Sequence, residues 1–490
     1  LTVKLLYALI NRREDVLCER FFTPTMNEPL RSLESNQPLK KFDIIAFTLQ
    51  YEEDYPNMIR MLIESKIPPR SKDRRRGDPI IIAGGPCATA NPEPLAEYVD
   101  LFVIGEAEAI LDNLIDKLKD VIFGSSRIED IADLKGIYIP KCKNDVERVW
   151  VKNLNEAPHP TAQQIPLVDD ESPYMTVFGR AFTVEAVRGC NRMCRFCLIG
   201  HIGAPMRLRT LRKIEEIIDE GIKYTPVEKV SLIGAGIFDH PNLEEICEII
   251  ISRGLKISIP SIRPEAITER LVRLLVEGGQ KTVSMAPDGA SQRMRDIIRK
   301  GMREEEIIEA AKILLSSGIR RLKLYYMIGL PKEKPEDIKY IAELSRKIAN
   351  LGYGSRSIHL SINPLIPKPH TPFQWEGLAP ITYVRKAIRE IRKTLSGDSR
   401  FVVEALDPRH AQIQALLSLG DRRIGGAIEL VAHLGGGFGA WRRALKEYGI
   451  DIHEYVCGRS VGEPMPWDHI HIGLNRRFFI DEVERYRSLD

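Results

Sequence analysis

The feature that most constrains the fold is a regular alternation of short apolar runs and amphipathic segments across residues 177–375. The apolar runs have the length and β-branched content of buried strands, and helical patterns separate them. Six such units in succession favour a partial (β/α)6 barrel of the TIM type, which carries its chemistry at the C-terminal ends of its strands. The predicted strands are 182–187, 229–233, 256–259, 281–286, 321–328 and 357–363.

Residues 1–125 alternate in the same way and predict a second α/β domain. Buried strands are expected at 42–49, 79–85 and 101–105, with helices between them, so the sheet is parallel and Rossmann-like. The chain opens on an amphipathic helical pattern at Leu1, and we therefore expect the first strand of this domain to be missing.

The rest of the chain divides by composition. Residues 126–176 contain several prolines and predict a linker with a small hairpin around 136–151. Residues 376–490 predict a small, mainly helical C-terminal domain. The expected fold class is therefore α/β throughout the first two domains, followed by helices.

Composition excludes several classes of protein. The 71 basic residues nearly balance the 68 acidic ones, which argues against a protein built chiefly to coat nucleic acid. No apolar run reaches the length of a membrane-spanning helix, and no signal peptide is evident, so we expect a cytoplasmic location without membrane insertion. Three of the eight cysteines crowd into one short segment, which indicates a metal site rather than a disulfide scaffold.

That segment holds Cys190, Cys194 and Cys197 in a C-x3-C-x2-C spacing directly after a predicted strand. Three thiolates can bind three irons of a [4Fe–4S] cluster and leave the fourth iron open. An open coordination position is the mark of a catalytic metal centre. A zinc site with His201 as the fourth ligand is the alternative that the spacing leaves open.

The spacing, with the aromatic Phe196 just before the last cysteine, is similar to the signature of the radical S-adenosylmethionine (SAM) superfamily. The resemblance implies that the open iron chelates the amino and carboxylate groups of SAM. It also implies that an electron from the cluster cleaves a sulfur–carbon bond of SAM and releases a 5′-deoxyadenosyl radical. The three cysteines are then both the metal ligands and the catalytic centre.

The ends of the later barrel strands resemble the SAM-binding segments of that superfamily. A glycine-rich turn follows the second strand, polar residues follow the third and fourth, and a Gly-Leu-Pro segment follows the fifth. Gly236 stands where an acidic residue is usual, and Asp288 stands where relatives tend to carry Glu. Tight turns and surface polarity are the alternative explanations. The candidate SAM-binding residues are Gly234, Gly236, Ser258, Ser261, Arg263, Asp288, Ile328 and Gly329.

Residues 83–108 resemble the cobalamin-binding domain that precedes many radical SAM barrels. The resemblance implies that a Gly-Gly turn lets backbone approach the nucleotide tail of cobalamin. Cys87 stands where many relatives carry His, and no Asp-x-His-x-x-Gly motif occurs, so a cobalamin-like fold without cobalamin is the alternative. The candidate cobalamin-binding residues are Thr48, Gly84, Gly85, Pro86, Thr89, Gly105 and Glu106.

Three further segments, 367–375, 420–423 and 466–469, resemble a largely uncharacterised radical SAM family. Its bacterial members are often fused to, or encoded beside, a domain thought to act near RNA. His370, Asp468 and His469 are candidate substrate-facing groups, with an ordinary loop role as the alternative.

Three functions stay open on the sequence. The first is cobalamin-dependent methyl transfer to an unactivated carbon. The second is cobalamin-independent hydrogen abstraction, with RNA among the possible substrates, and the third is a non-catalytic iron–sulfur or zinc protein. The cluster implies a reducing compartment and an electron donor such as ferredoxin or flavodoxin.

Overall fold

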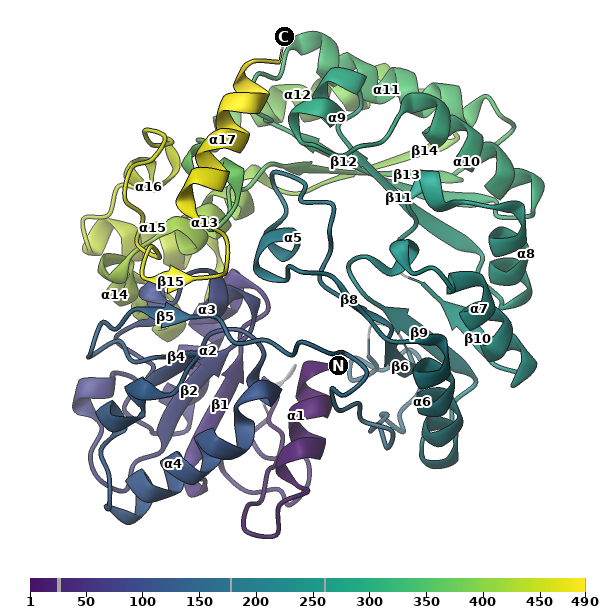
Figure 1. Ribbon diagram of the computed structural model, residues 1–490. Helices are drawn as coiled ribbons and strands as arrows, with labels where there is room; N and C mark the ends of the chain where they lie inside the picture. Colours follow the sequence, from purple (N-terminus) through teal and green to yellow (C-terminus); the bar gives the residue numbers. More distant parts are fainter. Residues whose placement is uncertain (24–27, 177–178, 260, 490) are drawn as a thin grey trace. The chain divides into compact units, whose positions relative to one another are not determined.

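The computed structural model describes residues 1–23, 28–176, 179–259 and 261–489, and these form two compact units (Figure 1). The chain passes between the units several times, so each unit combines early and late segments. The residues predicted to form a linker and a separate C-terminal domain are therefore shared between the units. Positions 177, 178 and 260, which belong to the predicted barrel, lie outside the described residues. The first unit is Leu1–Asn153, Pro367–Gly377 and Gln412–Phe479, and the second is Leu154–Ile366, Leu378–Ala411 and Ile480–Asp490.

The second unit is built on seven parallel strands. Three of them form one sheet in the order β10-β9-β6, and four form another in the order β11-β12-β13-β14. A parallel bridge between Ile262 and Met285 connects the chain after β10 to β11. The strands are β6 (Phe182–Glu185), β9 (Lys229–Ile233), β10 (Lys256–Ser258), β11 (Thr282–Asp288), β12 (Arg321–Ile328), β13 (Ile358–Pro364) and β14 (Phe401–Ala405).

Burial explains why these segments become strands. In β12, Leu322, Leu324, Tyr326 and Ile328 alternate with less buried residues and are fully buried. Such alternation directs one face of the strand into the core. The first six strands match the prediction closely, whereas β14 lies in the part of the chain expected to be helical.

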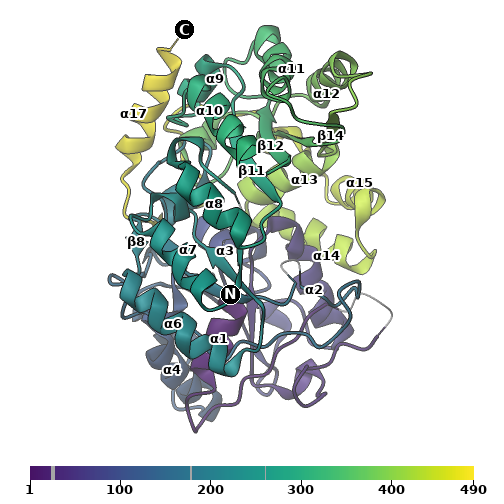
Figure 2. The ribbon, with the colours of Figure 1, turned by 90° about the vertical axis from the view of Figure 1, so that its right-hand side faces the viewer.

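Helices cover the outer face of these strands (Figure 1). Figures 1 and 2 show α6, α7 and α8 side by side. Thr210 and Thr268 cap α6 and α8 by accepting backbone N–H bonds at 3.3 and 3.0 Å. The helices are α5 (Leu198–Ile202), α6 (Leu211–Tyr224), α7 (Leu243–Ser252), α8 (Glu269–Glu277), α9 (Gln292–Ile297), α10 (Glu304–Ser316), α11 (Pro335–Ala349) and α12 (Ile381–Thr394).

The first unit contains a four-stranded sheet in the order β1-β2-β3-β4. The first three strands are parallel, as predicted, and β4 joins antiparallel to β3. The strands are β1 (Ile44–Thr48), β2 (Ile80–Gly84), β3 (Leu101–Val103) and β4 (Ile137–Tyr138).

The predicted hairpin around 136–151 is instead split between two sheets. β4 completes the sheet of the first unit, while β5 (Val146–Glu147) pairs in parallel with β15 (Ile470–His471) from the far end of the chain. The predicted linker is therefore, up to residue 153, part of the first unit.

The helices of the first unit also come from both ends of the sequence. α14 packs on α2, and α15 packs on α14. α13 (Pro408–Leu419) and α17 (Arg476–Arg487) contain residues of both units. No helix among the described residues is long and apolar enough to cross a membrane. The remaining helices are α1 (Thr2–Ile10), α2 (Tyr55–Glu64), α3 (Pro86–Ala90), α4 (Leu111–Phe123), α14 (Gly425–His433), α15 (Gly437–Glu447) and α16 (His453–Val456).

Candidate active site

The three clustered cysteines lie on one loop at the end of the first barrel strand. The chain continues from β6 into β7 (Val187–Arg188), which pairs antiparallel with β8 (Arg207–Leu208), and the loop then leads into α5. Cys194 is buried, while Cys190 and Cys197 are partly exposed. The predicted position of the motif, directly after a strand, is therefore found in the structure.

Gly189 at the start of this loop has a backbone conformation that requires glycine. Its φ is 78°, and a Cβ there would lie 2.2 Å from the carbonyl oxygen of Gly203. The N–H of Cys197 donates to the carbonyl of Cys194 at 2.9 Å, which closes a tight turn between the last two cysteines. Local backbone geometry thus gathers the three thiols on a compact turn.

A buried arginine between the cysteines fixes the loop to the second unit. The guanidinium of Arg195 donates to the carbonyls of Asp296 and Ile297 at 3.0 and 2.7 Å, and to Glu482 at 2.8 Å. Arg195 is only 6% exposed and Glu482 only 1% exposed. The sequence analysis missed this pair because its members lie far apart in the sequence, although a charged residue inside a cysteine motif was a signal.

Burial raises the pKa of Cys194 to about 11 and also raises the pKa of Cys197. Both are therefore neutral thiols in the metal-free chain, and metal binding must displace their protons. Three cysteine donors on one loop fit a cubane cluster, in which each thiolate binds a different iron. Among the described residues, no group of three or more His, Cys, Asp or Glu is arranged to hold a single metal ion.

His201, the residue considered as a zinc ligand, is fully buried beside the loop. Its Nδ1 lies 2.8 Å from the carbonyl oxygen of Cys197. Burial lowers the pKa of this histidine. This contact holds the first turn of α5 against the cysteine loop.

Ion pairs connect the cysteine loop to the ends of the next strands. Arg192, between the first two cysteines, donates to Asp239 after β9 at 3.2 Å, and its guanidinium lies 3.7 Å from Glu265 after β10. Glu265 accepts in turn from Arg263 at 2.8 Å. The predicted SAM-binding residue Arg263 is thus engaged with a carboxylate of its own segment.

A second ion pair lies beside Phe196. Asp288 at the end of β11 pairs with Lys300, and the Lys300 ammonium lies 5.8 Å from the centroid of the Phe196 ring. Burial alone would lower the pKa of Lys300, but the negative charge of Asp288 outweighs burial and raises it. The structure therefore brings Asp288 and Phe196 together through Lys300, which the sequence analysis did not identify.

The glycine-rich turn after β9 packs directly on the start of the cysteine loop. A Cβ on Gly234 would lie 2.6 Å from the carbonyl oxygen of Val187, and a Cβ on Gly236 would lie 2.8 Å from the sulfur of Met206. The contact with backbone requires glycine at position 234, whereas the Met206 side chain beside Gly236 is flexible. A role of their backbone in SAM binding stays a prediction.

A cavity of about 410 Å³ opens at the C-terminal ends of the central strands, where a barrel carries its chemistry. The predicted residues Ser261 and Asp288 line it, and Tyr325 and Asn363 add polar groups that were not predicted. Ser258, the last residue of β10, is not among the lining residues. The full lining is Ser261, Ala286, Asp288, Tyr325, Tyr326, Met327, Asn363 and Pro364.

The Gly-Leu-Pro turn after β12 is shaped by a carboxyl group. Ile328 is fully buried, and Gly329 has a φ of 73°, with Ala379 2.6 Å from the position of a Cβ. Glu333 accepts the N–H of Gly329 at 2.7 Å and the hydroxyl of Tyr383 at 2.6 Å. Burial raises the pKa of Glu333 to about 7.

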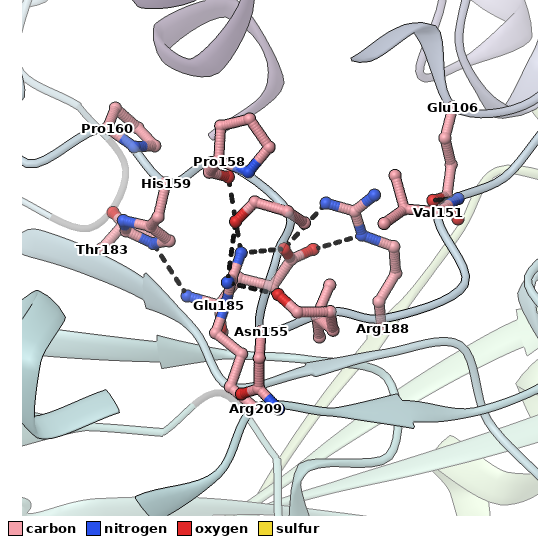
Figure 3. Close-up of polar contacts among 12 residues, drawn as sticks. Glu106, Val151, Asn155, Pro158, His159, Pro160, Thr183, Glu185, Arg188 and Arg209 are labelled. Carbon is pink, nitrogen blue, oxygen red and sulfur yellow. Dashed lines mark hydrogen bonds and ion pairs between the residues drawn. The ribbon is translucent and has the colours of Figure 1, made fainter. Parts of the chain in front are cut away.

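Several charged and polar side chains contact the end of β6, and Figure 3 shows them. Arg188 donates twice to Glu185, both at 2.8 Å, and the fully buried Arg209 donates to the carbonyls of Glu185 and Ala157 at 3.0 Å each. His159 accepts the N–H of Glu185 at 3.2 Å, and burial lowers its pKa to about 3, so this ring is a neutral acceptor. These contacts hold the strand that leads into the cysteine loop.

The predicted cobalamin-binding residues of the first unit have partners from their own unit. Thr48 and Gly84 end β1 and β2, and Pro86 begins α3. The hydroxyl of Thr89 accepts the N–H of Gly105 at 3.0 Å, and Glu106 accepts the N–H of Val151 at 2.9 Å.

The glycines beside them have no free space. A Cβ on Gly85 would lie 2.7 Å from the carbonyl oxygen of Leu49, and a Cβ on Gly105 would lie 2.0 Å from that of Val149. Close packing against the unit's own backbone therefore accounts for glycine at these two positions without any ligand. A role of these residues in cobalamin binding stays a prediction.

The two segments that contain the candidate substrate-facing residues contact each other inside the first unit. The side-chain oxygen of Gln374 accepts the N–H of His370 at 3.1 Å and the indole N–H of Trp467 at 3.0 Å. Asp468 accepts from Arg476 at 3.0 Å. The ring of His469 lies 4.5 Å from that of Tyr138.

Comparison with known proteins places the chain among enzymes of one superfamily. Residues 2–140 match a family described as radical SAM proteins, N-terminal, and residues 184–345 match the radical SAM superfamily. The chain is 34% identical over 373 residues to uncharacterized protein MJ0966 of Methanocaldococcus jannaschii, covering 74% of this chain and 77% of that protein.

Other relatives and solved structures have lower sequence identity to this chain. The chain is 27% identical to uncharacterized methyltransferase PH0819 of Pyrococcus horikoshii, covering 55% of this chain and 58% of that protein. Among solved structures it resembles the radical SAM methyltransferase TsrM from Kitasatospora setae, with cobalamin and a [4Fe–4S] cluster bound, at 16% identity and a TM-score of 0.49, covering 84% of this chain and 88% of that one.

Two family models match the chain, and one relative matches most of its length. The cysteine loop and the parallel barrel strands are consistent with these matches. The cofactors of this family are a [4Fe–4S] cluster and SAM. The chain is an enzyme that belongs to the radical SAM superfamily.

Proposed function

We propose that the protein cleaves SAM reductively at the cysteine loop and directs the resulting radical at a C–H bond of a substrate held in the barrel cavity. One observation carries this proposal. Asp288 lines the 410 Å³ cavity and, through Lys300, reaches the aromatic ring of Phe196 inside the cysteine motif. The cluster loop and the cavity are therefore parts of one site.

Cys190, Cys194 and Cys197 would hold the cluster, and the strand-end residues Ser261 and Asp288 would face SAM. When bound, the reduced cluster would supply one electron that cleaves a sulfur–carbon bond of SAM. The cleavage would give methionine and a 5′-deoxyadenosyl radical, which would take a hydrogen atom from the substrate. The residues of the chain would bind and orient the cluster, SAM and the substrate.

The chain performs that task with four features of the second unit. Arg195 and Glu482 hold the cysteine loop in place, and Lys300 places a positive charge beside it. Tyr326 is one of the residues that line the cavity and is fully buried. Tyr325 and Asn363 supply hydrogen-bonding groups for the substrate.

The reaction consumes an electron that the chain does not supply. We propose ferredoxin or flavodoxin as the donor. RNA is the first substrate class to test, because the family that residues 367–375 resemble is associated with RNA.

Methyl transfer to an unactivated carbon is a second candidate. It is favoured by the similarity to PH0819, whose name describes a methyltransferase, and by a 25% identical region of a ribosomal protein uS12 methylthiotransferase RimO from Trichodesmium erythraeum. The chain covers 58% and 45% of these two proteins, respectively.

The test is anaerobic turnover of SAM by the full chain after reconstitution of the cluster, with dithionite as reductant. We expect 5′-deoxyadenosine and methionine in equal amounts, and more of both when total RNA is added. Equal formation of S-adenosylhomocysteine would favour methyl transfer. A sample that contains about four irons per chain and forms no 5′-deoxyadenosine would contradict the proposal.

A further inference from the structure

The C-terminal edge of the first unit's parallel strands is where a doubly wound sheet binds its ligand. β1, β2 and β3 end there at Thr48, Gly84 and Val103. Two late segments of the same unit, residues 367–377 and 412–425, contact the turns that follow these strands. We call these two segments the cap.

The first contact between the turns and the cap is a buried ion pair. Glu52 lies four residues beyond β1 and is 3% exposed. Its carboxylate accepts from the Lys368 ammonium at 2.5 Å and from the Gln414 amide at 3.1 Å. Both carboxylate oxygens are therefore occupied by side chains of the cap.

The second contact is a buried network beyond β2. Glu93 follows α3 and accepts from Arg422 and from the Tyr138 hydroxyl, both at 2.5 Å. Arg422 also donates to the Tyr138 hydroxyl at 2.7 Å and to the carbonyl of Pro140 at 3.1 Å. The His469 ring lies 3.6 Å from Glu93. The cap is thus tied to the sheet through β4 as well.

The third contact uses backbone of the cap. The side-chain amide of Asn91, which is buried, donates to the carbonyls of Ser418 and Gly420 at 3.0 and 2.8 Å. A Cβ on Gly425 would lie 3.2 Å from the Tyr98 ring, so the start of α14 packs closely on the segment before β3. Each of these groups is in direct contact with its partner.

The turns themselves are closed beneath the cap. The position of a Cβ on Gly85 is 2.7 Å from a carbonyl oxygen of the β1 turn, and that on Gly105 is 2.0 Å from the carbonyl of Val149. Glu106, whose partner Val151 is drawn in Figure 3, accepts a backbone N–H of the same segment. The two glycines therefore pack against the unit's own backbone, and the Glu106 carboxylate already has a partner within the unit.

We infer that the cap closes this edge permanently and that the first unit takes up no cobalamin in the folded protein. The Glu52–Lys368 and Glu93–Arg422 ion pairs hold the cap against the turns that follow the strands. Opening the edge for a corrin ring would separate both buried pairs and leave charges without partners, which proteins tolerate poorly. The inference rests on the first unit alone and not on the proposed reaction.

The test begins with the reconstituted full chain, mixed with excess hydroxocobalamin and desalted anaerobically. We expect no cobalamin to elute with the protein, by absorbance and by mass spectrometry. Retention of about one cobalamin per chain would overturn the inference. Formation of 5′-deoxyadenosine, measured on the same sample, reports separately on the proposed function.

The neighbouring residues Arg422 and Arg423 provide a matched pair of variants. Arg422 makes the buried contact with Glu93, whereas Arg423 pairs with Asp421, lies 5.4 Å from the centroid of the Tyr455 ring and has a side chain that is 67% exposed. Hydrogen exchange of residues 87–95 and 412–422 should become faster, by tenfold or more, in Arg422→Gln and stay unchanged in Arg423→Gln. Equal exchange in the two variants would show that the cap is not locked and would contradict the inference.

Discussion

The two units carry similar sequence signals at the ends of their parallel strands and use them differently. In the second unit, Gly234 and Gly236 pack against the cysteine loop, and polar side chains beyond them line a cavity. In the first unit, Gly85 and Gly105 pack against the chain's own carbonyls, and ion pairs close the edge. Glycine at a strand end therefore reports close packing, and only the surrounding polar groups show whether a ligand can enter.

The largest expected effect is a difference in iron content between variants of a second-unit cysteine and a first-unit cysteine. Cys194→Ala removes one of three cluster ligands and should abolish both the visible iron–sulfur absorbance and 5′-deoxyadenosine formation. Cys87→Ala, at a buried site of the first unit, should leave iron content unchanged. Iron and sulfide analysis of both variants checks this, and loss of the cluster in Cys87→Ala would break the comparison.

The next largest effect concerns the support of the cysteine loop. Arg195→Met removes the buried partner of Glu482, which keeps only the more exposed Arg299 and Arg485, and should lower the free energy of unfolding by about 1.5–3 kcal/mol. Arg212→Met is the control, because its i,i+4 pair with Glu216 is exposed and should contribute little to stability. Urea unfolding followed by circular dichroism measures both, and equal losses would contradict the role of Arg195.

A smaller effect follows from the raised pKa of Glu333, which is about 7 against an ordinary value of 4.5. Between these values the folded chain holds a proton that the unfolded chain has released, so stability falls as pH rises through this window. Relative to Glu333→Gln, the wild type should lose about 2–3 kcal/mol between pH 4.5 and 7.

Thermal unfolding at several pH values measures this loss. The exposed Glu336 supplies a control, since Glu336→Gln should not alter the pH profile in the same direction. A wild-type profile parallel to that of Glu333→Gln would show that the carboxyl is not buried as described.

The smallest effect is a shift of the cluster's reduction potential. The Lys300 ammonium beside Phe196 favours the more negative, reduced cluster, so Lys300→Met should lower the potential by tens of millivolts. Asp288→Asn keeps the ammonium and removes its partner, so it should raise the potential. Potentiometric titration monitored by electron paramagnetic resonance measures the two shifts, and shifts of the same sign would contradict this role.

Local sequence patterns predicted most strands well, because a run of apolar residues indicates that the segment is buried. β9 and β12 begin and end at the predicted residues, since their β-branched and apolar runs can only be buried. β14 was missed because it follows a long helix in a segment that is otherwise helical. The unit boundaries were missed because the chain returns to the first unit at 367–377 without a change in composition.

The site was predicted only where the chemistry is local. The cysteine motif spans eight consecutive residues and is therefore visible in the sequence, while the role of its cysteines as cluster ligands stays a prediction. Pairs such as Arg195–Glu482 and Glu52–Lys368 join residues hundreds of positions apart, and no spacing rule connects them. The contact that Gln374 makes between the segments 367–375 and 466–469 was likewise invisible, although both segments stood out in the sequence.

The central claim is that the barrel site works while the first unit stays closed to cobalamin. The most direct test is 5′-deoxyadenosine formation from SAM by the reconstituted full chain, prepared without cobalamin and then assayed with and without added hydroxocobalamin. The account predicts turnover in the cobalamin-free sample and no change on addition. Turnover that appears only when cobalamin is added would contradict it.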